Sequence, residues 1–188
     1  MPYATLQNVK DYLTVNSVDA TDDALIEFLL DGVTAAIDRV TGRTFAADGP
    51  TNRSFEVPWG SDELLFDHDL ASLTSVLNAN SGQIASSDYR LLPLNGYPKY
   101  GLRLLSNASW EQEDDGLVVV NGVWAYAPTV PDAIVHACVV WTAAEYRKRT
   151  GEGENGVMVT PDGVRILPAG MPKTVAVILN AYKRSGVA

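Results

Sequence analysis

A division between helical and β-type sequence patterns constrains the fold of this chain more than any other feature. In residues 5–13, 21–42, 131–149 and 172–184, apolar side chains recur every three or four positions. This repeat places the apolar side chains on one face of an amphipathic helix. We therefore predict two helices before residue 50 and two after residue 130.

The middle of the chain shows a different pattern. From about residue 53 to residue 124, short apolar and β-branched runs alternate with clusters of Gly, Pro, Asn and Asp. Such runs are typical of strands joined by tight turns. The predicted strands are 53–57, 63–66, 75–78, 89–92, 102–104 and 117–120. Their spacing predicts a small antiparallel sheet or barrel.

Together the two patterns predict an α+β fold: mainly a helical bundle formed by the N- and C-terminal segments, with an inserted small antiparallel β region. The 188 residues are enough for one ordinary domain and few for two, so we expect a single domain over 1–188. Its predicted parts are N-terminal helices in 1–48, a β-rich insertion in 50–128, a long helix in 130–150, and a hinge, a short β piece and a C-terminal helix in 151–188.

Acidic residues outnumber basic ones. The 14 Lys and Arg residues against 23 Asp and Glu residues give a formal net charge of −9. DNA and many membrane surfaces are polyanionic, so this charge argues against a free-standing DNA-binding or membrane-binding protein. No apolar run approaches the ~18 residues of a membrane span, and the first residues lack the pattern of a signal peptide. We therefore expect synthesis in the cytoplasm and no membrane partner.

Candidate catalytic groups are few. Asp67, His68 and Asp69 are consecutive, and consecutive strand residues point to opposite faces, so they favour a solvated turn over a metal site. His136 and Cys138 are two residues apart on a predicted helix and do not share a face. No phosphate-binding loop, nucleophile elbow or zinc-protease motif is present. We predict no enzyme activity, no cofactor and no metal.

Charged residues are distributed unevenly along the predicted helices. Every charged residue between Lys10 and Arg39 is acidic. This stretch is either a solvated helix face or an acidic surface that meets a basic neighbour. Bases gather at the ends of the last two predicted helices, in Arg147-Lys148-Arg149 and Lys183-Arg184, where they also match the negative end of a helix dipole.

Several segments resemble the head–tail connector proteins of tailed bacteriophages, also called adaptor or head-completion proteins. The segments are ATLQNVKDYL at 4–13, DDALI at 22–26, AAID at 35–38, TGRTF at 41–45, YRLLPLNG at 89–96, VVNGVWAY at 119–126, VPDAI at 130–134, YRKR at 146–149 and LNAYKR at 179–184. They extend over most of the chain and are diffuse helical signatures rather than an invariant catalytic string.

The resemblance implies a structural virion protein of the head–tail neck. Such a protein assembles as a dodecameric ring under the portal, extends the DNA channel without specific DNA binding, and carries a stopper or tail-completion protein on its tail side. It has no catalytic residues to transfer to this chain. A neck or tail-completion protein of the same assembly is one alternative, and a small cytoplasmic enzyme or ligand-binding module built on the β region is another.

The end of the chain holds the predicted interaction residues. After a hinge at 151–156, we expect a two-stranded piece in 157–167 and a helix in 172–184. Both are too short to be stable uncovered, so they either fold back on the chain's own helices or dock on a neighbouring subunit or the portal, and we favour docking. We also expect Cys138 and Trp141 to be buried in the long helix. The predicted protein-interaction residues are Arg147, Lys148, Arg149, Ile178, Leu179, Tyr182, Lys183 and Arg184.

Overall fold

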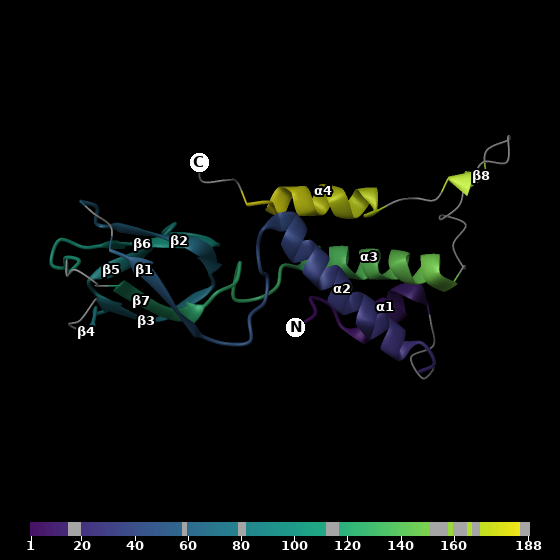
Figure 1. Cartoon of the computed structure of the whole chain (residues 1–188), viewed down its shortest axis with the longest axis horizontal. Coiled ribbons are helices and arrows are strands. Elements are labelled where there is room, and N and C mark those ends of the chain that lie inside the picture. The colour runs from purple at the N-terminus through teal and green to yellow at the C-terminus, as the bar shows by residue number, and fades with distance from the viewer. Residues whose placement is uncertain are drawn as a thin grey trace. The chain divides into compact units, whose positions relative to one another are not determined.

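The chain divides into two compact units (Figure 1). The helical unit contains Met1–Gly42 and Pro131–Ala188, and the β unit contains Arg43–Val130. The computed structural model describes residues 1–14, 20–57, 60–78, 82–111, 117–150, 158–159, 165–166 and 170–184. The predicted hinge at 151–156 lies outside these residues.

The described part of the helical unit contains four helices: α1 (Leu6–Leu13), α2 (Asp23–Thr41), α3 (Asp132–Thr150) and α4 (Lys173–Tyr182). Their ends follow local signals. Thr5 caps α1 by accepting a hydrogen bond from the Asn8 backbone N–H, while the Asn8 side chain returns to the Thr5 backbone. Gly42 ends α2 with a φ of 66°, a left-handed conformation that glycine adopts without steric cost.

The core of the helical unit lies between α2 and α3, with α1 and α4 packed against both. Its side chains follow the predicted apolar stripes and are at most 5% exposed: Val9, Ile26, Leu30, Val33, Ile37, Ile134, Ala137, Cys138, Ala143, Tyr146, Val175 and Leu179. Burial of this much apolar surface is the main stabilising contribution in such a unit.

Polar side chains add specific links across this core. The Tyr146 hydroxyl donates to Asp22 Oδ2 at 2.6 Å, which joins the C-terminal half of α3 to the start of α2. The Tyr3 hydroxyl donates to Asp38. Lys10 Nζ, on a side chain only 3% exposed, lies 2.6 Å from Asp23 Oδ1. Each of these polar side chains therefore has a partner that offsets its lost hydration.

Two antiparallel sheets form the β unit. One has the order β1 (Thr51–Glu56), β7 (Leu117–Val123), β3 (Ser72–Asn78), β4 (Gly82–Gln83), and the other has the order β2 (Glu63–Leu70), β6 (Lys99–Leu104), β5 (Tyr89–Leu92). In the first sheet Phe55 pairs with Val118. In the second, Leu64 pairs with Leu102. All six predicted strands are confirmed, and the two-residue β4 was not predicted.

The inner faces of both sheets contribute to one hydrophobic core. At one part of it the rings of Phe55, Phe66 and Trp124 lie 5.3–5.8 Å apart, centroid to centroid. The Arg53 guanidinium lies 5.0 Å from the centre of the Trp124 ring. The Trp124 indole N–H is satisfied by the Thr51 carbonyl at 3.0 Å.

A short antiparallel pair precedes α4. It consists of β8 (Met158–Val159) and β9 (Arg165–Ile166). The two-stranded piece predicted within 157–167 is therefore confirmed. None of the helices in the described ranges has the length and apolar character of a membrane span.

The predicted predominance of a helical bundle is wrong. The β region is not a small insertion, because its two sheets have their own core and form a unit comparable in extent to the helical one. The fold is α+β, with helices and sheets segregated. The prediction of a single domain over 1–188 is not decided by this division and stays a prediction.

Two further expectations need correction. The apolar face of α4 packs on α2 and α3 of its own chain rather than on a neighbour, and Val175 and Leu179 are completely buried there. Cys138 is buried as expected, but Trp141 is only half-buried. The residues that lie on the buried face of α3 at this point are Thr142 and Ala143.

A pair of substitutions tests the packing of α4. Leu179→Ala should lower the free energy of unfolding by about 2–5 kcal/mol, since it opens a cavity in a closed core. Val177→Ala is the matched control, because Val177 is 72% exposed on the same helix and should change stability by less than about 0.5 kcal/mol. Urea titration followed by far-UV circular dichroism measures both. Equal effects would mean that α4 is undocked in solution.

A second pair tests the close approach of β7 to β3. A Cβ on Gly122 would lie 2.7 Å from Leu70 Cδ1 and nearer still to the Ser72 carbonyl oxygen. Gly122→Ala should therefore destabilise the β unit by about 1–3 kcal/mol, read from the urea dependence of tryptophan fluorescence, to which three of the four tryptophans contribute from the β unit. Gly32→Ala, in α2 with open space around it, should instead stabilise by about 0.5–1 kcal/mol.

Candidate functional site

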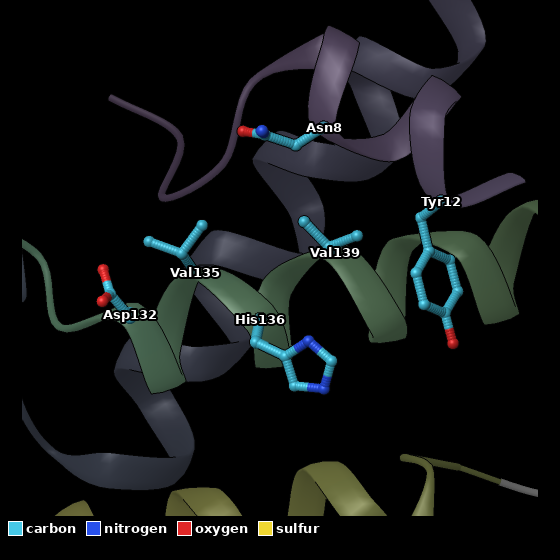
Figure 2. A pocket seen from close by; sticks show the side chains of 6 residues that line it. All are labelled: Asn8, Tyr12, Asp132, Val135, His136 and Val139. Carbon is cyan, nitrogen blue, oxygen red and sulfur yellow. The ribbon is translucent and has the colours of Figure 1, made fainter.

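A surface groove lies between α1 and α3 in the helical unit (Figure 2). Its volume is about 390 Å³. Asn8 and Tyr12, one turn apart, form the α1 side, and Asp132, Val135, His136 and Val139 form the α3 side. The helical repeat of three to four residues explains this arrangement, because side chains at that spacing share a face.

The groove has an apolar floor and a polar rim. Val139 is almost fully buried and Val135 is half-buried, whereas Asn8, Asp132 and His136 are exposed. Tyr12 is 43% exposed, and the Arg147 guanidinium lies 5.7 Å from its ring centre. Such a groove suits a protruding apolar side chain with charges around it better than a small polar substrate, which needs convergent buried polar groups.

The predicted basic residues at the end of α3 are held differently from one another. Arg147 covers the Tyr12 ring. Lys148 Nζ lies 2.7 Å from Glu145 Oε1 and 3.3 Å from the Gly170 carbonyl oxygen. Arg149 is exposed at the surface. Arg147 therefore borders the groove, and Lys148 links α3 to the segment that enters α4.

The predicted interaction residues of α4 fall into two groups. Leu179 is a core residue, while Ile178 and Tyr182 are half-buried and Lys183 is exposed. The Arg184 backbone N–H donates to the Thr41 carbonyl at 2.9 Å, so this end of the chain is tied to the end of α2. Because α3 and α4 run in opposite directions, the two basic clusters lie at opposite ends of the helical unit (Figure 1).

The Asp67-His68-Asp69 sequence does not converge on one point. His68 Nδ1 lies 3.0 Å from Asp67 Oδ1 and 2.6 Å from an Arg53 nitrogen, while Asp69 pairs with Arg43 at 2.6 Å. Burial tends to raise the pKa of Asp67, but the hydrogen bond and charge of His68 and the charge of Arg53 hold this pKa below its ordinary value. Within the described ranges, no three His, Cys, Asp or Glu side chains are grouped to hold a metal ion.

Cys138 and His136 point away from each other as expected. His136 lies on the exposed rim of the groove (Figure 2), whereas Cys138 is completely buried, with its Sγ 3.9 Å from the Thr34 hydroxyl. Burial raises the pKa of the Cys138 thiol, and the Thr34 contact offsets only part of this effect. A thiol in this setting is a poor nucleophile.

Sequence reasoning missed the groove and one residue on another face of the same unit. Phe28 is 70% exposed on α2, on the side opposite the buried stripe of Ile26, Leu30, Val33 and Ile37. Its position was a usable signal, since a phenylalanine between Glu27 and Asp31 falls outside the predicted apolar stripe. The groove itself could not be found this way, because α1 and α3 are more than 100 residues apart in sequence.

The whole fold matches solved structures of phage-like particles. One matching chain comes from the neck of an empty gene transfer agent (GTA) particle computed with C6 symmetry, with a TM-score of 0.63 and 15% identity over 99% of this chain and 92% of that chain. A chain from the virion of a native GTA particle matches with a TM-score of 0.64 and 15% identity, over 99% of this chain and 92% of that chain. A chain from the neck of a native GTA particle computed with C12 symmetry matches with a TM-score of 0.62 and 15% identity, over 99% of this chain and 91% of that chain.

These similarities show a shared fold over nearly the full length of both chains. They include both units, so the β unit is part of the common architecture. No protein-family model and no curated protein matches the sequence.

The buried thiol gives a test of the helical unit. Cys138 should react with a thiol reagent at neutral pH far more slowly in the native protein than in urea, because it is inaccessible and its raised pKa leaves little thiolate. The rate is followed by absorbance with an aromatic disulfide reagent. Native labelling as fast as labelling in urea would show that α3 does not pack as described.

Proposed function

We propose that this chain is a structural neck protein of a phage-like particle, acting as a head–tail connector. The single observation that carries this proposal is the fold match over 99% of the chain to chains from GTA particle necks. The resemblance of segments at both ends of the chain to head–tail connectors supports the same class independently of the fold.

In this proposal the chain forms a ring under the portal, with twelve copies in the particle. The C6 and C12 symmetry of the neck structures that share its fold supports a ring. Head-to-tail contacts between identical subunits close into such a ring when the rotation between them closes. The portal lies on one side of the ring and a stopper or tail-completion protein on the other.

The charge of the chain fits a channel through which DNA moves. Tight contacts between basic side chains and phosphates would hold the DNA and release counterions, as in DNA-binding proteins. A net charge of −9 disfavours such contacts. The ring therefore extends the channel without binding the DNA specifically.

Exposed charges at the helix ends are the proposed contacts with other neck components. Arg149, in the last turn of α3, and Lys183, directly after α4, are exposed. Lys148 precedes Arg149, and Ile178, Tyr182 and Arg184 belong to the same C-terminal segment as Lys183. Charged residues on an interface rim fix the orientation of partners more than they add affinity. We assign them to contacts with the portal and with the tail-side protein.

Two experiments on particles test the role. In immunogold electron microscopy, antibodies against the chain should label the junction of head and tail in particles from cells that carry its gene. Deletion of the gene should leave DNA-filled heads without tails, and a complementing copy should restore them. Label elsewhere, or normal tailed particles after deletion, would contradict the proposal.

A further inference from the structure

The outer face of α2 has the shape of a contact surface. Four exposed residues, Ala24, Phe28, Gly32 and Ala35, follow one another at helical spacing along it. Three of them are small, and a Cβ added at Gly32 would meet nothing within 4 Å. Phe28 is therefore a single aromatic knob, 70% exposed, on an otherwise flat helix surface.

The groove between α1 and α3 is large enough for this knob. A cavity of about 150 Å³ holds a benzene ring, and the groove measures about 390 Å³. Its floor of Val135 and Val139 is apolar, as a phenyl ring requires. Aromatic side chains that enter apolar pockets are the usual anchors of protein interfaces.

Knob and groove lie on opposite sides of the helical unit. In Figure 1, α2 crosses in front of α3, whereas Figure 2 shows the groove with α2 behind α3. The buried stripe of α2 faces the core that it shares with α3, and Phe28 is exposed on the opposite side of α2, so it cannot enter the groove of its own chain. Two different, complementary surfaces on opposite sides of one protomer are the requirement for head-to-tail assembly.

The charges around the two surfaces are also complementary. Glu27 and Asp31 flank Phe28, both are exposed, and the structure gives neither an ion-pair partner among the residues it describes. The Arg147 guanidinium lies against Tyr12 at one end of the groove, while Asp132 lies at the other end (Figure 2), so the Tyr12 end carries the positive charge. Opposite charges around an apolar anchor set the orientation of two partners.

We propose that Phe28 of one subunit enters the α1–α3 groove of a second copy of this chain, with Glu27 and Asp31 facing that copy's Arg147. The contact rests on the proposed ring and names the surfaces that build it. Each subunit then offers the knob to one neighbour and the groove to the other. Glu27 and Asp31 are then the residues through which the acidic stretch of α2 contacts a basic residue, Arg147 of the second copy.

Cross-linking between two single variants tests the contact directly. Phe28→Cys and Val135→Cys proteins, both full-length, are mixed in equal amounts and treated with a short bismaleimide. The mixture should give covalent dimers containing one chain of each variant, whereas neither variant alone should. A mixture of Val177→Cys and Val135→Cys is the control, since Val177 is equally exposed but lies on α4.

Sedimentation velocity tests the energetic role of the knob. Phe28→Asp should weaken self-association by about tenfold or more, as expected for an interface anchor. Val177→Asp should leave self-association unchanged, and both variants should keep the wild-type melting temperature because both side chains are exposed.

The outcomes separate this contact from the proposed role in the neck. If the wild-type chain self-associates but Phe28→Asp has no effect and the mixture gives no mixed dimer, the surfaces are wrong while the neck role stands. A wild-type chain that stays monomeric and gives no mixed dimer also overturns the contact. If the mixed dimers form but the gold-labelled antibodies do not bind at the neck, the contact stands and only the proposed role in the neck is contradicted.

Discussion

Packing between α2 and α3 is the contact on which the rest of the helical unit depends. The two helices lie on either side of the β unit in sequence, so their contact closes a loop that contains the whole of that unit. The entropic cost of closing a loop grows only slowly with its length. Apolar burial along α2 and α3, together with the bond from Tyr146 to Asp22, offsets that cost.

The same helices decide which acidic residues are available to a partner. Asp22, Asp23 and Asp38 bond within the chain, to Tyr146, Lys10 and Tyr3. Burial raises the pKa of Asp38, and the Tyr3 hydrogen bond works against this rise. The uninterrupted acidic stretch of the sequence is therefore partly structural, and only some of its carboxylates remain at the surface.

Local features of the fold were predictable and pairings between distant segments were not. The structure contains the helix cap at Thr5, the helix end at Gly42 and the predicted strands. Each of these features depends on residues that are close together in sequence. The pairing of Phe55 with Val118, and the groove between α1 and α3, depend on contacts that no local pattern encodes. The extent of the β unit was underestimated for the same reason, because its core forms only when both sheets pack together.

The place where the β unit joins the helical unit has an evolutionary consequence. The chain leaves the helical unit after Gly42 and returns to it at Pro131, so the whole β unit lies between two parts of the helical unit in sequence. The described core of the β unit consists of residues of that unit, so a substitution within it acts first on the packing of the two sheets. An inserted unit with a core of its own can change in length or sequence at lower cost than a segment that supplies the core of the unit around it.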